Sequence, residues 1–129
     1  MSEKFNLEII SPEKILIKDQ VESVTIPSFE GEMTLLSNHV SLITFLRPGI
    51  TTVLAGQKSE YFVEEGTVEF SKNSLIILSS SIINLKELSK EKINQMISEC
   101  EKSLKQEKVD DKKNYILSHK VDVLSRINL

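Results

Sequence analysis

The sequence predicts a mainly β protein with α content, in which an N-terminal antiparallel β-sandwich or barrel precedes a C-terminal antiparallel two-helix hairpin. Short runs of alternating apolar and polar residues, separated by turn residues about every 8–12 positions, fill the first part of the chain. All three prolines and all four glycines lie at or before Gly66, and the residues beyond the strands carry apolar side chains at helical spacing. Frequent turns, followed by a part with helical periodicity and without glycine or proline, indicate two structural modules.

Charge divides the chain near the same point. Residues 1–84 carry six basic and eleven acidic groups, a net charge of −5, whereas residues 85–129 carry ten basic and eight acidic groups, a net charge of +2. This asymmetry suggests modules with different solvent-facing roles. We therefore expect a β-sandwich domain over residues 1–86 and a helical hairpin over residues 87–129.

The strands are predicted from alternation with a period of two. Phe5, Leu7 and Ile9 alternate with polar residues, as in a strand with one buried face. Lys72 and Asn73 fit a turn between the last two strands. No strand–helix–strand alternation appears, so the strands are expected to pair antiparallel. The predicted runs are residues 5–9, 15–17, 21–26, 61–63, 67–70 and 74–78.

The first helix is predicted over residues 90–105. Ser89 is a suitable N-cap residue, and Glu91 places an acidic group in the first turn. At 100° per residue, the apolar side chains fall within an arc of about 100°, which is typical of a helix buried along one stripe. These side chains are Ile93, Met96, Ile97, Cys100 and Leu104.

The second helix begins after Asp110 or Asp111, either of which can cap it. Its apolar residues cover about 160° of arc, which is more than one partner helix requires. The extra width is explained either by packing on the β module or by contact with another subunit. The apolar residues are Ile116, Leu117, Val121, Val123, Leu124 and Ile127.

The composition is that of an ordinary globular chain of 129 residues, with 40% hydrophobic and 27% charged residues. The net charge of −3 gives no reason to expect nucleic-acid binding. The longest apolar run, residues 75–78, is too short to cross a bilayer. No secretion or import signal is recognised at the start of the sequence. A single cysteine, Cys100, fits a reducing compartment.

The residues that usually carry catalysis or metal binding are few and scattered. The glycine spacing fits no phosphate-binding loop. His39 and His119 belong to different modules, and Cys100 is interpreted as a small buried hydrophobe. The adjacent carboxylates at residues 64–65 and 110–111 lie in polar turn settings. We therefore expect no metal site and no enzyme activity of the chain by itself.

Several short motifs, in their order and spacing, resemble the epsilon-subunit family of the bacterial rotary (F-type) ATP synthase. The resemblance extends over essentially the whole chain. It rests on LEIISP at residues 7–12, EGE at 30–32, His39, LRPG at 46–49, YFV at 61–63 and Gly66. It implies a ten-stranded β-sandwich followed by a two-helix hairpin.

The sequence departs from this family's pattern in the loop around His39. Thr34 stands where the family usually has a glycine, and Ser37 and Ser41 stand in place of two prolines. Glu65 replaces a glycine that often precedes Gly66. Because proline restricts the unfolded chain, its loss is expected to loosen the loop.

The resemblance implies a non-catalytic subunit of the central stalk. The sandwich would bind the gamma subunit on one side and the polar loops of the membrane c-ring at one end, so that all three turn together. Glu32 and His39 occupy the family's loop positions and are candidates for c-ring docking. Alternatively, Glu32 is a solvated turn residue, and His39 braces the loop through a backbone carbonyl. The implied location is the cytoplasmic face of the bacterial inner membrane, with membrane association only through the complex.

The helical hairpin carries the regulation that the resemblance implies. In the family the hairpin either folds down on the sandwich or extends along gamma into the catalytic head. The extended form blocks ATP hydrolysis, partly through basic groups on the second helix that meet the alpha and beta subunits. The candidates here are Lys112, Lys113, Lys120 and Arg126. The alternative is that these residues form a solvated helix face, since isolated exposed ion pairs contribute only about 0–1 kcal/mol.

Some family members bind ATP through a motif Ile/Leu-Asp-x-x-Arg-Ala that opens the first helix. The corresponding residues here are Ser89, Lys92 and Ile93, so the carboxylate, the guanidinium and the small residue are all replaced. We expect no tight ATP binding and no other cofactor.

Two further interpretations compete with the stalk subunit. One is a free-standing β-sandwich adaptor with a helical docking tail, and the other is a stand-alone nucleotide sensor. The adaptor would bind its partner without gamma, whereas the sensor would become more compact when nucleotide is added.

Overall fold

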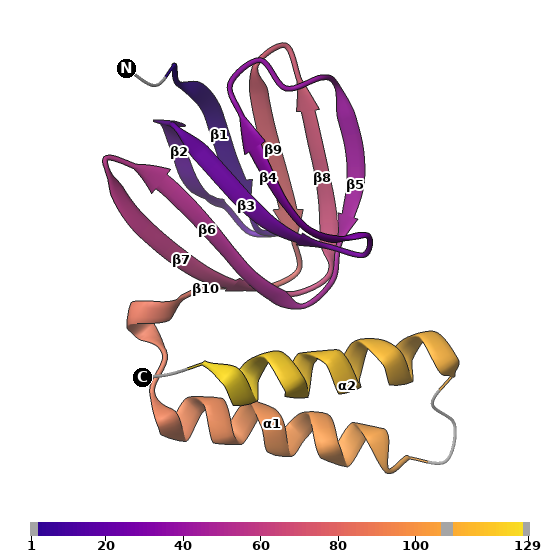
Figure 1. The fold of residues 1–129 in the computed structure, drawn as a ribbon. Coiled ribbons are helices and arrows are strands. Elements are labelled where there is room, and N and C mark those ends of the chain that lie inside the picture. Colours follow the sequence, from indigo (N-terminus) through magenta and orange to yellow (C-terminus); the bar gives the residue numbers. More distant parts are fainter. Residues whose placement is uncertain (1–2, 107–109, 128–129) are drawn as a thin grey trace. The chain divides into compact units, whose positions relative to one another are not determined.

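The computed structural model describes residues 3–106 and 110–127 of the chain. Contacts divide it into two compact units, residues 1–84 and residues 85–129, which we describe separately. The first contains ten strands and the second contains two α-helices after a short 3-10 helix (Figure 1). The predicted fold class is therefore confirmed. The expected domain boundary at residue 86 lies within the 3-10 helix η1 (Leu85–Glu87).

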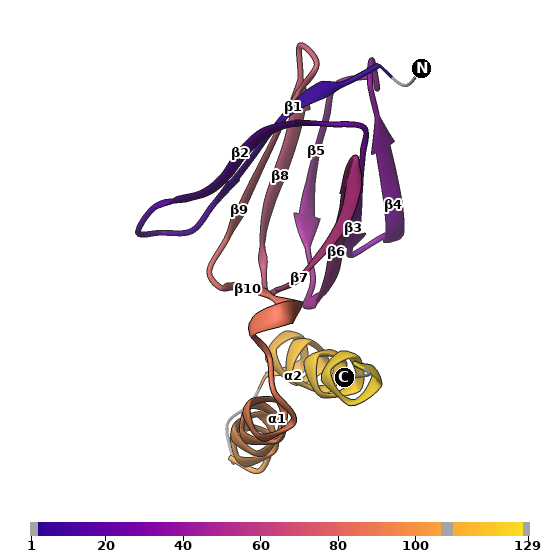
Figure 2. The same ribbon diagram turned by 90° about the vertical axis from the view of Figure 1, so that its left-hand side faces the viewer.

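The ten strands form one continuous sheet that folds over into two layers (Figures 1 and 2). Their order is β10-β7-β6-β3-β5-β8-β9-β1-β2, and β4 pairs with β3 alone. All pairs are antiparallel except β1 with β9, which is parallel. The strands are β1 (Phe5–Ile10), β2 (Ile15–Val21), β3 (Ser23–Ser28), β4 (Gly31–Leu36), β5 (Leu42–Leu46), β6 (Gly49–Ala55), β7 (Gln57–Val63), β8 (Gly66–Ser71), β9 (Ser74–Ser79) and β10 (Ile82–Asn84).

The core lies between the two layers and is built from the alternate side chains of each strand. Phe5 meets Phe70 edge to face, with ring centroids 5.6 Å apart. Each fully buried side chain of this size contributes about 1.5–3 kcal/mol relative to an exposed one. The buried cluster comprises Phe5, Leu7, Ile9, Val21, Val24, Ile26, Leu35, Leu46, Val53, Val63, Val68, Phe70, Leu75 and Ile77.

Two details of the predicted strands are corrected. Val21 ends β2, and β3 begins only at Ser23, so the predicted run over residues 21–26 is two strands. The segment expected to be a loop around residues 30–42 contains β4, because Met33 and Leu35 point inward while Glu32 and Thr34 alternate outward. The predicted turn is confirmed: Lys72 and Asn73 have φ angles of 51° and 57°, which suits a tight turn between β8 and β9.

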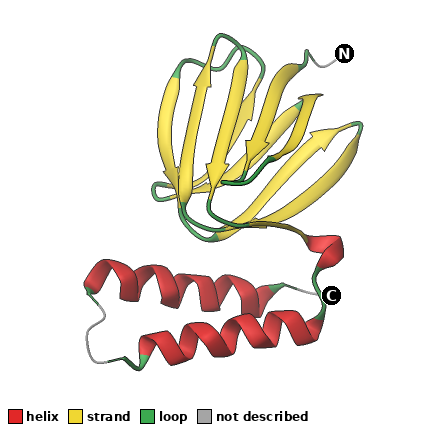
Figure 3. Ribbon diagram, turned by 180° about the vertical axis from the view of Figure 1, so that it is seen from behind, coloured by secondary structure: helices red, strands yellow, loops and turns green. Residues whose placement is uncertain are grey.

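The second unit is an antiparallel helical hairpin (Figure 3). Its helices are α1 (Lys90–Leu104) and α2 (Asp111–Arg126). The Ser89 hydroxyl accepts a hydrogen bond from the Lys92 N–H at 3.1 Å, and Asp110 Oδ1 accepts one from the Lys113 N–H at 2.7 Å. Both predicted caps are therefore confirmed, with Asp110 rather than Asp111 at the second helix.

The buried stripe of α2 is narrower than the apolar arc that the sequence predicted for the second helix. In α1 Ile93, Met96 and Cys100 are buried, as predicted, whereas Ile97 and Leu104 of the same predicted stripe are half-buried. In α2 only Ile116 and Leu124 are buried. The other apolar residues of the wide stripe on α2 are half-buried: Leu117, Val121, Val123 and Ile127.

Candidate functional site

The two residues predicted to dock on the c-ring lie at opposite ends of one strand. Glu32 is the second residue of β4 and is exposed, whereas His39 follows the end of this strand. From Glu32 to the last strand residue, Leu36, an extended chain covers about 13 Å. The structure therefore does not bring Glu32 and His39 together. Glu32 was expected in a turn, but it lies in β4, directly after the turn between β3 and β4.

The contacts of His39 are those of a residue that braces its loop. Its ring Nδ1 donates a hydrogen bond to the Val40 carbonyl at 2.7 Å, and its backbone N–H donates to the Leu36 carbonyl at 3.2 Å. The imidazole also meets the Phe70 ring edge to face at 5.7 Å. The alternative interpretation of His39, a bond to a nearby backbone carbonyl, is thus present in the structure.

The loop that lacks the family's prolines is tied down by Asn73. The backbone N–H of Asn38 donates to Asn73 Oδ1 at 2.7 Å, and the Ser37 hydroxyl donates to the same oxygen at 3.3 Å. Asn38 itself adopts a φ of 65°, a conformation that asparagine tolerates better than most residues. Its side-chain amide donates to Glu3 Oε2 at 2.7 Å. These hydrogen bonds restrict the conformation of the loop and so compensate in part for the missing prolines.

The turn between β3 and β4 presents an aromatic and acidic tip. The fully buried Ser28 hydroxyl donates to the Gly31 carbonyl at 2.6 Å and accepts from the Glu30 N–H at 3.2 Å, which fixes the turn. The Phe29 N–H donates to the Phe45 carbonyl at 3.2 Å. The tip therefore displays Phe29 and Glu30 beside the exposed Glu32.

The solvent-facing side of β5, β8, β9 and β1 is unusually apolar; we call it the outer face. Ile43 is 72% exposed, Phe45 59% and Leu78 45%. In an antiparallel sheet with one covered side, the other side normally carries polar residues. The outer face consists of Glu8, Ile10, Ile43, Phe45, Thr67, Glu69, Ile76 and Leu78.

Strand pairing arranges these residues in two rows. The first row runs Phe45, Thr67, Leu78, Ile10. The second row runs Ile43, Glu69, Ile76, Glu8. One row is thus almost entirely apolar, and the next alternates apolar side chains with carboxylates.

Sequence reasoning missed the outer face, although a signal was present. Residues 75–78 form the longest apolar run in the chain. A continuous apolar run is typical of a strand that is covered on both sides. Leu75 and Ile77 enter the core, whereas Ile76 and Leu78 face outward.

A shallow groove borders the outer face at one end of β8 and β9. It is lined by Ile10, Pro12, Thr67 and Leu78 among others. Gly66 belongs to this lining, and a side chain there would collide with the Leu78 carbonyl. A glycine at this position therefore keeps the two strands close.

The four basic candidates of the hairpin spread over about 140° around the axis of α2. Lys113 and Lys120 lie on the side of the helix that buries Ile116 and Leu124. At 100° per residue, Arg126 lies about 120° around the axis from Lys120. Lys112 and Lys113 are exposed in the first turn, and Lys120 is half-buried.

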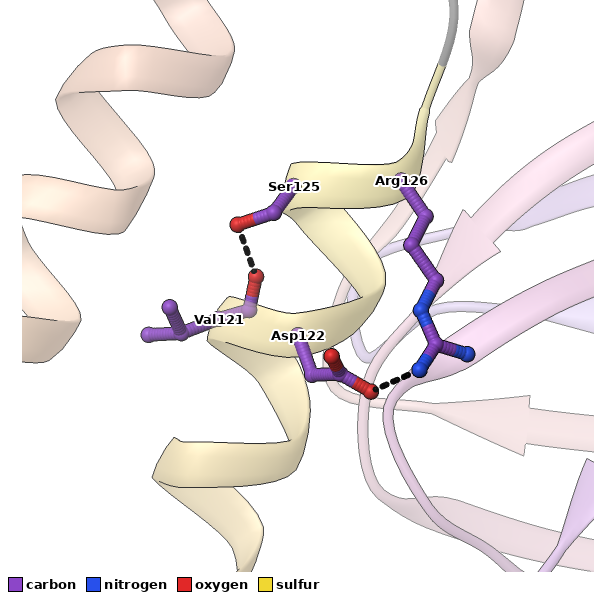
Figure 4. A network of polar contacts seen from close by, with 4 residues as sticks. All are labelled: Val121, Asp122, Ser125 and Arg126. Atoms are coloured by element: carbon purple, nitrogen blue, oxygen red, sulfur yellow. Dashed lines mark hydrogen bonds and ion pairs between the residues drawn. The ribbon is translucent and has the colours of Figure 1, made fainter.

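Arg126 is engaged within its own helix (Figure 4). Its guanidinium lies 3.0 Å from Asp122 Oδ2, one turn earlier, while the Ser125 hydroxyl donates to the Val121 carbonyl at 2.7 Å. Both partners of the ion pair are exposed, at 77% and 50%, so the pair contributes only about 0.3–0.5 kcal/mol. A stronger acidic partner can therefore displace Asp122 at little cost.

The residues at the positions of the family's ATP motif have structural roles in this chain. The Ser89 hydroxyl caps α1, Ile93 is buried on its inner side, and the side chain of Lys92 is exposed. Within residues 3–106 and 110–127, no cluster of three or more histidine, cysteine, aspartate or glutamate residues is placed to hold a metal ion. In the same residues, no helix has the length and apolar character needed to span a membrane.

Comparisons with known proteins agree with this architecture. The family model described as "ATP synthase, Delta/Epsilon chain, beta-sandwich domain" matches residues 4–85. A relative from Pelagibacter ubique, named ATP synthase epsilon chain, is 42% identical over 99% of this chain and 100% of its own length. A relative of the same name from Rhizobium etli is 31% identical over 88% of this chain and 86% of its own.

Solved structures share the fold. A chain of the Euglena gracilis mitochondrial ATP synthase aligns with a TM-score of 0.75 and 21% identity, over 95% of this chain and 78% of that one. A chain of the Tetrahymena thermophila mitochondrial ATP synthase, from its central stalk and c-ring, aligns with a TM-score of 0.74 and 14% identity, over 97% and 96%. With the domain match and the full-length bacterial similarity, the resemblance is confirmed: the chain belongs to the ATP synthase epsilon-chain family.

Proposed function

We propose that the chain is a non-catalytic subunit of the central stalk of an F-type ATP synthase, where it joins the gamma subunit to the c-ring. The observation that carries this proposal is the apolar outer face on a sandwich whose core is already closed. Large exposed apolar patches of this kind mark protein–protein contacts. The chain is similar over its full length to a bacterial epsilon chain, and this similarity supports the gamma subunit as its neighbour in the complex.

A close-packed sandwich suits the transmission of torque. Interiors packed at crystal-like density have low compressibility, so a force applied at one end reaches the other with little deformation. The two sheet layers share one core, which resists sliding of one layer over the other. The chain would thus act as a stiff connector and perform no bond chemistry.

The tip between β3 and β4 is the best candidate for the c-ring contact. Glu32 is exposed there beside Glu30, and the Ser28 hydrogen bonds hold the turn in one shape. An acidic tip suits basic side chains on the ring's polar loops. His39 lies beyond the other end of β4, and its contacts favour a bracing role over a direct part in this contact.

The helical hairpin is proposed to restrain ATP hydrolysis by contact with the alpha and beta subunits. Support comes from its net charge of +2 and from the exposed Lys112 and Lys113 at the start of α2. Arg126 adds a cation whose present partner is weakly held. Several such groups together can bias two hairpin positions that differ by a few kcal/mol.

The proposed location is the cytoplasmic face of the bacterial inner membrane, as a peripheral subunit held there by the complex. Similarity to bacterial relatives supports a bacterial enzyme rather than an organelle one. No contact of the chain itself with lipid is proposed.

Co-purification from a membrane extract tests this function. An affinity-tagged chain, expressed in its own cells and extracted in mild detergent, is expected to bring gamma and the c-ring with it. Recovery of a partner set that lacks gamma would favour the adaptor. Recovery of the chain alone, with compaction on adding ATP, would favour the nucleotide sensor; either result overturns the stalk assignment.

A further inference from the structure

We propose that the N-terminal segment, residues 3–6, and the loop between β4 and β5, residues 37–41, open and close as one unit whose latch is the side chain of Asn73. Strand pairing does not join these two segments, because β1 pairs with β9 and β2, whereas β4 pairs with β3 and β5 with β3 and β8. They are distant in sequence as well, since Glu3 and Asn38 are 35 positions apart. They are connected by side chains around the turn between β8 and β9.

The amide of Asn73 holds one segment with its oxygen and the other with its nitrogen. Oδ1 accepts hydrogen bonds from the Asn38 N–H at 2.7 Å and from the Ser37 hydroxyl at 3.3 Å. Nδ2 donates to the Lys4 carbonyl at 3.4 Å, and the Asn73 backbone carbonyl accepts from the Asn6 N–H at 3.1 Å. The partners fix the orientation of the amide, because its oxygen faces an N–H and its nitrogen faces a carbonyl.

Two further contacts join the same segments. The Asn38 side-chain amide donates to Glu3 Oε2 at 2.7 Å, which connects them directly. The ring of His39 meets Phe70 edge to face at 5.7 Å, and Phe70 meets Phe5 in the same manner at 5.6 Å. A polar connection and an aromatic one therefore run in parallel from the loop to the start of β1. Groups that share partners in this way respond together when one contact is removed.

The backbone at both asparagines indicates that their side chains are needed. Asn73 has a φ of 57° and Asn38 a φ of 65°, in the left-handed region that glycine adopts at lower cost. Glycine at position 73 would give up the bonds to Asn38 and Lys4, and glycine at position 38 would give up the bond to Glu3. The contacts of the latch thus compensate for the backbone conformation of the two residues that make them.

The latch determines how one exposed apolar side chain is presented. Val40 lies in the loop and is 76% exposed. Loops held by few and exposed hydrogen bonds open locally without unfolding of the whole domain. With the latch closed, Val40 is displayed in one conformation, so a molecule that contacts it does not have to order the loop first. Release of the N-terminal segment would remove this order at Val40 from the other side of the latch.

Amide hydrogen exchange of the isotope-labelled full-length chain, followed by NMR, tests the latch. Asn73→Gly keeps the left-handed turn and removes both side-chain bonds, and it is expected to speed exchange of the Asn38 and Asn6 amides by about tenfold. The Asn6 amide keeps its own acceptor, the backbone carbonyl of residue 73, so faster exchange there reports opening of the N-terminal segment. Lys72→Gly is the matched control: Lys72 has a φ of 51° in the same turn, and the variant should leave both amides unchanged.

Glu3→Ala approaches the latch from the other segment and carries the test if Asn73→Gly does not fold. It leaves the bond from the Asn38 N–H to Asn73 in place, so several-fold faster exchange at Asn38 and Asn6 alike would report joint opening. Faster exchange in only one segment, or unchanged exchange at Asn38 in the variants that fold, would overturn the inference. Equal acceleration of the amides of β6 and β7 would also overturn it, because the opening would then be global.

Discussion

Gly66 lies directly beneath the backbone carbonyl of Leu78, at the point where β8 and β9 separate. A Cβ atom on Gly66 would overlap the Leu78 carbonyl oxygen and would also lie too close to the Ser79 Cα atom. The same part of the sheet is secured by the buried Ser79 hydroxyl, which donates to the Glu64 carbonyl at 3.1 Å. The obstacle is therefore the backbone of β9, which cannot rotate out of the way as a side chain can.

Gly66→Ala is expected to destabilise the chain by about 2–3 kcal/mol or more, because the strands must separate to admit the methyl group. The free energy of unfolding in urea measures this. Gly56→Ala is the matched control. Gly56 has a φ of 77° but nothing within 4 Å of its Cβ position, so it loses only the backbone preference of about 1–2 kcal/mol. Equal losses at the two glycines would contradict the steric account.

The sequence allowed most of the fold to be predicted because its local signals and its final structure agree. Alternation identified β1, β8 and β9, and the caps at Ser89 and Asp110 fixed the start of both helices. The parallel pairing of β1 with β9 had no local signal, because the two strands are far apart in sequence and pairing is decided by the closed sandwich. The resemblance supplied the strand number.

The candidate sites were less predictable, since proximity along the chain says little about position in a sheet. Glu32 and His39 are close in sequence, yet a strand in extended conformation separates them. The reverse holds for Phe45 and Leu78, which are distant in sequence but lie in the same row. The direction of each exposed side chain depends on strand pairing, which the sequence did not reveal.

Glu32→Lys is expected to weaken recovery of the c-ring several-fold while leaving recovery of gamma unchanged. The substitution reverses the charge of the exposed tip, so attraction to a basic ring loop becomes repulsion. Because the contact is solvent-exposed, the difference should shrink when extraction is repeated at high salt. Glu60→Lys on β7 makes the same change in charge away from the tip. Ring recovery that is the same for both variants would exclude Glu32 from the contact.

Calorimetry with ATP on the isolated chain is expected to detect no tight binding. Ser89 lacks a carboxylate and uses its hydroxyl to cap α1, and Lys92 lacks the planar fork of arginine. The double variant Ser89→Asp, Lys92→Arg restores two elements of the family motif and keeps a capping residue, so it is expected to bind ATP more tightly than the unsubstituted chain. Ile93 is left in place, because its truncation would cost about 2–5 kcal/mol of core packing. Tight binding by the unsubstituted chain would refute this account.

Removal of residues 87–129 is expected to leave assembly with gamma and the c-ring intact and to raise ATP hydrolysis by the complex. The sandwich core uses residues 5–77 alone, so the shortened chain keeps every side chain of that cluster. If the hairpin inhibits about half of the complexes at any time, hydrolysis should rise about twofold. The assay is steady-state ATP hydrolysis by purified complexes that contain equal amounts of the catalytic subunits.

A charge-only variant decides whether basic groups carry this inhibition. Replacement of Lys112, Lys113, Lys120 and Arg126 by glutamine keeps the hairpin but removes its cations on α2, and it should raise hydrolysis as far as the deletion does. The matched control removes four cations of α1 and its C-cap and should change little; it replaces Lys90, Lys92, Lys102 and Lys105 by glutamine. Since the four groups of α2 spread over about 140° around its axis, an inhibitory contact that uses all of them must cover more than a third of the helix circumference. Flat hydrolysis in both the deletion and the glutamine variant would mean that this hairpin does not restrain the enzyme.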